Sequence, residues 1–150
     1  MSQTLPAKLT LLLQEQQFGI LSSFFSEDPN FPFCSLMQYC YESPTSLIFK
    51  TAHIAEHHKN LSLNGNASLF IAGIESQNPL SQSRLTLLLH CQIIEQQEVP
   101  KVREAWEHHT LKVIPPEIEN SFAYWRATIK KVRWIAGFGE MGWITYDSVR

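Results

Sequence analysis

The chain has 150 residues, 44% of them hydrophobic and 17% charged, which is typical of one globular domain with a substantial core. The formal net charge of -2 at pH 7 argues against a nucleic-acid-binding surface, which needs a basic excess. No apolar window is long enough to cross a bilayer, and residues 1–13 lack the features of a signal peptide. We therefore expect a single domain over residues 1–150, with no nucleic-acid or membrane partner.

The first predicted element is a helix over residues 5–16, because four leucines recur at helical spacing: Leu5, Leu9, Leu12 and Leu13. Three apolar or alternating runs then predict strands, which are expected at residues 18–25, 33–41 and 47–51. Turn-forming clusters at residues 27–30 and 43–46 separate these strands. A helix over residues 53–64 follows, with Ile54, Leu61 and His58 on one side, and the glycine at position 65 ends it.

The second half of the chain begins with a strand at residues 67–73 and a polar loop at 77–83. The next strand, residues 84–96, carries apolar side chains on both faces, which predicts a central position in the sheet. A helix over residues 99–109 comes next. The final strands are expected at residues 121–135 and 141–146, with a bend at Gly137-Phe138-Gly139 that sets Trp143 against the sheet.

The order of these elements predicts the fold class. Most strands follow one another directly, whereas a parallel βαβ sheet would place a helix between them. Small antiparallel sheets of about this size commonly close into a barrel, because closure removes the unpaired edges. We expect an α+β domain that is mainly β, with an antiparallel barrel and a few flanking helices.

The most informative stretch for chemistry joins a strand to a helix at residues 49–61. Thr51 ends the strand, and the helix N-terminus that follows presents unpaired N–H groups and a partial positive charge. Together with His57 and Lys59, these groups could form a phosphate site without a glycine-rich loop. The alternative is a solvated amphipathic helix whose polar side chains face water.

Histidines and cysteines raise two further possibilities. On the predicted helix, His53 and His57 stand four residues apart, but a zinc site needs three or four ligands, so we expect exposed histidines and no metal. The odd number of cysteines without CxxC spacing indicates reduced thiols in a cytoplasmic protein, with a catalytic cysteine as the alternative; they are Cys34, Cys40 and Cys91. No GxSxG, HExxH, Walker or GxGxxG motif is present.

Taken in order, several short segments resemble the flavin-binding split-barrel superfamily of pyridoxamine 5'-phosphate oxidase, and its haem-utilisation-like branch in particular. The similarity covers roughly residues 17–145. The matching segments are residues 31–36, 54–61, 66–69 and 84–87, and Gly137-Phe138-Gly139 with Trp143. His57 falls where the oxidase has a phosphate-binding lysine, and Glu56 falls where it has an arginine.

The resemblance implies a six-stranded antiparallel split barrel that forms a homodimer and binds FMN at the subunit interface. It also implies a set of cofactor-binding residues, which are Ser35, Thr51, His57, Lys59, Asn60 and Arg84. The leading hypothesis is an FMN-dependent oxidoreductase acting on a small molecule, in which the flavin carries the redox chemistry. The alternatives are a haem-binding or haem-handling barrel and a cofactor-free binding module.

Overall fold

The computed structural model describes residues 4–74 and 76–146. Its helices are α1 (Ala7–Glu15), α2 (Glu56–Leu63) and α3 (Val99–His109), with short 3-10 turns η1 (Pro79–Ser81) and η2 (Pro116–Ser121). Its strands are β1 (Phe18–Phe24), β2 (Pro32–Ser43), β3 (Ser46–Ala52), β4 (Asn66–Ala72), β5 (Arg84–Ile93), β6 (Phe122–Gly137) and β7 (Glu140–Thr145). None of the helices in these ranges has the length and apolar character that a membrane span requires.

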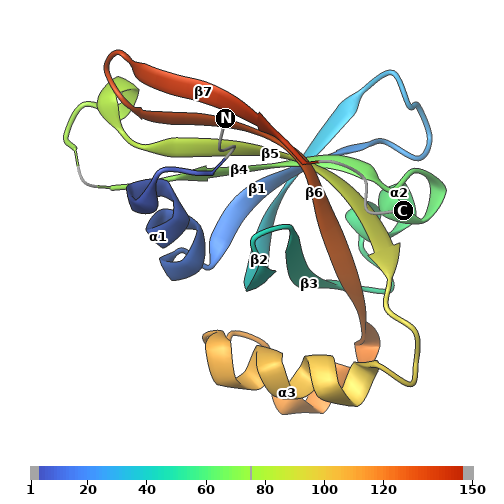
Figure 1. The fold of residues 1–150 in the computed structure, drawn as a ribbon. Helices are drawn as coiled ribbons and strands as arrows, with labels where there is room; N and C mark the ends of the chain where they lie inside the picture. The colour runs from blue at the N-terminus through green and yellow to red at the C-terminus, as the bar shows by residue number, and fades with distance from the viewer. Residues whose placement is uncertain (1–3, 75, 147–150) are drawn as a thin grey trace.

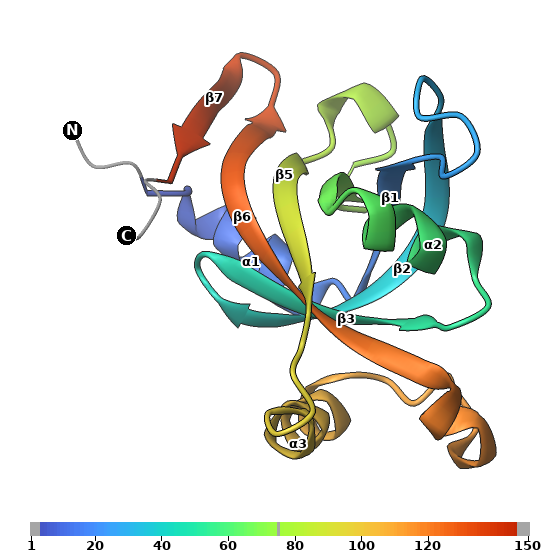
Figure 2. The same ribbon diagram turned by 90° about the vertical axis from the view of Figure 1, so that its right-hand side faces the viewer.

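The strands form one antiparallel sheet that closes into a barrel (Figures 1 and 2). The order along the sheet is β3-β2-β1-β4-β5-β6-β7, and β3 pairs back onto β6, from Ser46 opposite Thr128 to Ala52 opposite Phe122. Strand β6 makes this closure possible because it is 16 residues long. Its first half pairs with β3 and its second half with β7, while β5 follows its other edge. The predicted six-stranded antiparallel barrel is confirmed, and β7 is an extra strand beyond it.

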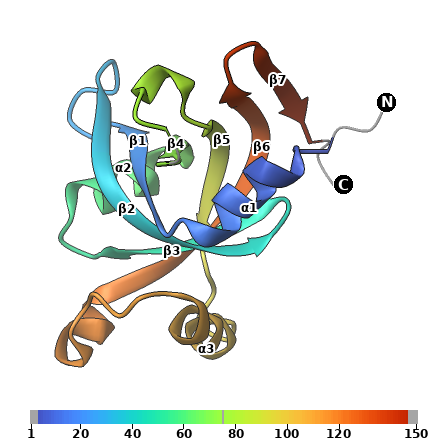
Figure 3. The same ribbon diagram turned by 90° about the vertical axis from the view of Figure 1, so that its left-hand side faces the viewer.

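The core lies inside the barrel and follows the alternation of the strands. In β5 the residues at every second position are buried, and they are Leu85, Leu87, Leu89 and Cys91. This strand lies between β4 and β6, which confirms the predicted central position. Helix α1 packs on the flank of the barrel (Figure 3), with Leu9 and Leu13 buried. The hydroxyl of Tyr39 donates a hydrogen bond to the Leu13 carbonyl at 2.8 Å, so β2 holds the end of this helix.

The helix predicted over residues 53–64 starts three residues later than expected, at Glu56. The carbonyl of Ala52 accepts a hydrogen bond from the N–H of Ala55, which makes a turn out of the residues between them. Ile54 lies in this turn, before the helix begins, and is 89% exposed, so the prediction that it shares one side of the helix with Leu61 was wrong. Ala55 occupies the N-cap position and has no side-chain group that could accept a hydrogen bond from the helix. The strand predicted to run to residue 96 likewise ends earlier, at Ile93.

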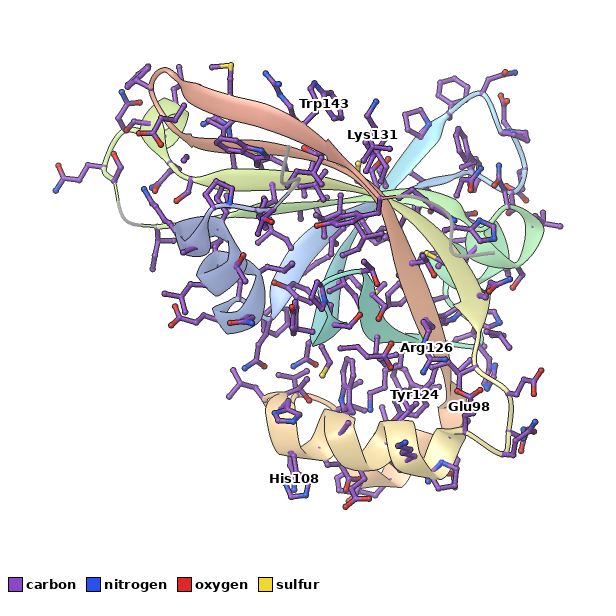
Figure 4. All side chains as sticks on the ribbon, in the orientation of Figure 1. Glu98, His108, Tyr124, Arg126, Lys131 and Trp143 are labelled. Carbon is purple, nitrogen blue, oxygen red and sulfur yellow. The ribbon has the colours of Figure 1, made fainter. Side chains whose placement is uncertain are left out.

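The β6–β7 hairpin contains the bend that the glycines predicted. Gly137 has a φ of 143° and Gly139 a φ of 81°, a region that side chains disfavour. Trp143 is half-exposed on the outer face, instead of packing against the barrel as expected. Its ring lies under two cations, 4.8 Å from Nζ of Lys131 and 5.5 Å from Cζ of Arg133. Figure 4 shows Lys131 and Trp143 together on the outer side of β6 and β7.

Candidate functional site

A groove of about 240 Å³ lies where α3 and the segment after it face the start of β1, the middle of β2 and the end of β3. Helix α3 runs across this end of the barrel in Figures 1 and 2. Most of the side chains lining the groove are apolar, and they are Phe18, Leu36, Met37, Ala52, Trp106, Val113, Ile114 and Phe122. Its polar residues are Gln38, Lys50 and His57. We call this cavity the α3 groove.

His57 is the second residue of α2 and the only imidazole in the lining of the α3 groove. Its ring has no hydrogen-bond partner among the described residues, and it is partly buried. Burial, and then the neighbouring His58, lower the pKa of His57 below its ordinary value. The ring is therefore neutral at pH 7, with one nitrogen that carries no hydrogen and can bind a metal or accept a hydrogen bond.

Thr51 is fully buried, and its hydroxyl has two protein partners. It accepts a hydrogen bond from Nε1 of Trp125 at 2.8 Å and lies 2.7 Å from Nδ1 of His58. Because its oxygen already accepts from the indole, the hydroxyl hydrogen can be donated to the imidazole. The structure thus joins Thr51 to His58, whereas the sequence analysis grouped it with His57.

Lys59 and Asn60 also have partners within the protein. Lys59 is exposed and lies 3.6 Å from the carboxylate of Glu56, one turn earlier on α2. Asn60 is fully buried, and its side-chain amide donates to the Ser23 hydroxyl at 3.0 Å. Its side-chain oxygen accepts from the backbone N–H of Ser26 at 2.9 Å. Asn60 therefore fastens α2 to β1 and the loop after it.

The last two predicted site residues lie elsewhere in the fold. Ser35 is opposite Leu21 in the β1–β2 pair, and its buried hydroxyl has no hydrogen-bond partner among the described residues. Arg84, at the start of β5, donates from Nη1 to the carbonyls of the η1 turn, at 3.0 Å for Leu80. Of the six predicted residues, only His57 lines the α3 groove.

Sequence reasoning missed Lys50, which the structure places in the wall of the α3 groove. It is buried, and its ammonium donates to both carboxylate oxygens of Glu119, at 2.7 and 2.8 Å. Its Nζ also lies 5.2 to 5.5 Å from the ring centres of Trp106, Phe122 and Tyr124. The available signal was a single charged residue in a strand, residues 46–52, whose other members are apolar except Ser46 and Thr51.

The histidines near α2 do not form a metal site of the usual kind. The rings of His53 and His58 meet edge to face, 5.3 Å between centres. Among residues 4–74 and 76–146, no group of three histidine, cysteine, aspartate or glutamate side chains is arranged to hold a metal ion.

The sequence matches no protein-family model and no curated protein. Solved structures do match it. A haem-binding protein from Mycobacterium smegmatis is similar at a TM-score of 0.79 and 24% identity, over 89% of this chain and 55% of that protein. A FAD-binding protein from Mesorhizobium loti is similar at a TM-score of 0.68 and 14% identity, over 86% of this chain and 92% of that one.

A third similar structure is a putative pyridoxamine 5'-phosphate oxidase from Listeria innocua. It matches at a TM-score of 0.66 and 17% identity, over 87% of this chain and 97% of that one. The chain thus spans just over half the length of the mycobacterial protein and nearly all of the Listeria protein. At these identities the likeness is one of fold, and it agrees with the closed barrel and the extra strand described above. The chain therefore has the split-barrel fold of the pyridoxamine 5'-phosphate oxidase-like proteins, as the sequence resemblance implied.

Proposed function

We propose that the α3 groove binds a flat conjugated cofactor, and that the protein is a haem-binding or haem-handling split barrel. The observation that carries this proposal is the neutral, unpartnered imidazole of His57 in a largely apolar groove. Neutral imidazole is a common ligand of haem iron, and apolar side chains around a macrocycle limit the access of water. The similarity in fold to a haem-binding protein supports the same choice.

The donors near α2 fit a flavin phosphate poorly. A phosphate monoester carries about two negative charges near neutral pH and needs several donors that are free to turn toward it. The hydroxyl of Thr51 and the side-chain amide of Asn60 are already occupied, and Lys59 is exposed beside Glu56. Burial also favours the uncharged form of His57, which makes it a weaker partner for a dianion.

In the haem proposal, His57 would hold the iron and the apolar residues of the α3 groove would contact the faces of the ring. Haem, when bound, supplies iron-centred redox chemistry, and the protein supplies ligation and exclusion of water. An FMN-dependent oxidoreductase acting on a small molecule is the second candidate. It is favoured by the likeness in fold to a FAD-binding protein and to a putative oxidase.

We also propose that the protein is a homodimer, joined through the outer face of the sheet. One row of cross-strand neighbours on this face runs over six strands: Leu36, Ile20, Phe70, Thr86, Arg133 and Trp143. The four large apolar members of the row are exposed, Leu36 by 70%. Exposed apolar patches of this kind often mark interfaces. Because Leu36 also lines the α3 groove, a second copy on this face would border the cofactor site.

The test is a titration of the purified protein with haem, FMN and riboflavin. We expect haem to give a sharp Soret band and His57→Ala to weaken its binding at least tenfold, while His108→Ala, which removes an exposed histidine of α3, serves as the matched control. If His57→Ala binds haem as tightly as the wild type, the assignment of His57 fails. Tight FMN binding, weak riboflavin binding and no Soret band would establish the second candidate instead.

A further inference from the structure

A second cavity of about 330 Å³ adjoins the α3 groove. The two cavities share five lining residues, which are Gln38, Lys50, Trp106, Val113 and Ile114. The second cavity extends between α3 and the segment that leads into η2. Its additional charged residues are two cations and two carboxylates, namely Arg103, Lys112, Glu107 and Glu119. We call this space the Arg103 cavity.

The carboxylate of Glu119 already accepts three hydrogen bonds from the protein. It accepts both hydrogen bonds from Lys50, and its Oε1 also accepts from the hydroxyl of Tyr124 at 2.9 Å. Burial opposes ionisation of Glu119, but these hydrogen bonds from Lys50 and Tyr124 outweigh it and lower the pKa. The ion pair with Glu119 therefore cancels the charge of Lys50, but it does not neutralise the other two cations of the cavity, Arg103 and Lys112.

Two cations of the cavity are not balanced in this way: Lys112, which is exposed, and Arg103, which is partly buried. Arg103 forms no ion pair with any carboxylate of residues 4–74 and 76–146, but its charge lowers the pKa of Glu119, and a hydrogen bond that it donates to the Tyr124 hydroxyl works against the rise in the pKa of Tyr124. Its Nε is buried and has no hydrogen-bond partner in that part of the chain. Buried donors are nearly always satisfied, and Arg103 lines the cavity, so its guanidinium has hydrogen-bonding capacity that the described residues leave unused.

We propose that the Arg103 cavity binds a carboxylate that is carried on a flat apolar group. A guanidinium presents paired donors that match the two oxygens of a carboxylate. Trp106, Val113 and Ile114 supply the apolar wall for the body of the ligand. The carboxylates of Glu107 and Glu119 lie in the same lining, so the cavity suits a single negative charge better than a dianion such as phosphate.

Two sources share this chemistry: a propionate side chain of a porphyrin held in the α3 groove, and a free aromatic acid. The first source rests on the proposed function, whereas the second does not. Absorbance titrations with haem and with haem dimethyl ester test the first. We expect Arg103→Met to weaken haem binding at least tenfold and to leave binding of the ester unchanged. Lys101→Met, which removes an exposed cation from the same helix, is the matched control and should bind haem like the wild type.

Benzoate and benzamide test the second source without any cofactor. Binding is followed by NMR through the indole N–H signal of Trp106, and benzamide has the same shape without the charge. If the wild type binds benzoate but no haem, the haem proposal is refuted. The carboxylate site is then supported if Arg103→Met binds benzoate at least tenfold more weakly than the wild type. Arg103→Lys keeps the charge but loses the paired donors, so its affinity for benzoate should lie between that of the wild type and that of Arg103→Met. If Arg103→Met does not fold, the comparison of Arg103→Lys with the wild type tests the carboxylate site. If benzoate and benzamide bind alike, and haem and its ester bind alike, the carboxylate site is refuted.

Discussion

Replacement of Thr51 by valine should destabilise the protein far more than its small change in shape suggests. Valine keeps the volume of threonine but removes the hydroxyl that joins Trp125 to His58. The indole N–H of Trp125 is buried and would then have no acceptor, which costs about 1–3 kcal/mol. Loss of the bond to His58 adds about 0.5–1.5 kcal/mol, because that ring is partly exposed and can turn to water. We expect the free energy of unfolding to fall by about 1.5–4.5 kcal/mol.

Urea denaturation followed by tryptophan fluorescence measures this loss, and Thr51→Ser is the matched control. Serine keeps the hydroxyl and removes one buried methyl group, which should cost about 1 kcal/mol. The valine variant should therefore be the less stable of the two, although it preserves more of the packing. The hydroxyl bridge is not important for stability if Thr51→Ser proves as destabilising as Thr51→Val. The same conclusion follows if Thr51→Val lowers the free energy of unfolding by less than about 0.5 kcal/mol, which is the effect of an ordinary surface substitution.

Three further predictions concern the interface, the hairpin and acid stability. Leu36→Glu should convert a dimer of the 17.3 kDa chain into a monomer by light scattering, and a wild type that is already monomeric at micromolar concentration would refute the proposed interface. Gly137→Val should lower the melting temperature by several degrees, because its φ of 143° strains a β-branched residue even though the nearest atom to a new Cβ is 3.9 Å away; an unchanged melting curve would contradict this. The hydrogen bond from Arg126 lowers the pKa of Glu42, so the charged carboxylate stabilises the fold above about pH 4.5, and that stability is lost as the pH falls further. Glu42→Gln should accordingly show a shallower loss of unfolding free energy below pH 4.5 in acid titrations, and an equal slope would rule out this contribution.

The fold could be predicted because its strands carry their own signals. Two of these signals can be recognised from one sequence: the apolar alternation in residues 84–93 and the direct succession of strands. Each depends only on residues that are near one another along the chain. The beginning of α2 could not be read in the same way. Ala55 at the N-cap gives no capping signal, and the turn at residues 52–55 is made by backbone hydrogen bonds alone.

The candidate site was harder to predict because its contacts are long-range. Thr51 looked available at the end of a strand, but its hydroxyl meets Trp125, 74 positions later. Lys50 likewise finds its carboxylate 69 positions away, at Glu119. Only closure of the barrel through β3 and β6 brings these pairs together. His57 could be named from the sequence because it stands near the strand-to-helix junction itself, and the structure places it in the lining of the α3 groove.

Closure of the barrel also decides where the sheet can still accept a foreign strand. Strand β3 is paired on both edges, with β2 and β6, and β6 is shared among three neighbours. Within the described ranges, the longest unpaired strand edges are those of β7 and of the first part of β2, residues 32–38, which pairs only with β1. Pro32 begins the second of these edges and offers no N–H to an incoming strand. Because the long β6 pairs with three strands, few strand edges are left to which a strand of another chain could hydrogen-bond. This pairing therefore protects a chain with 17% charged residues against edge-to-edge aggregation.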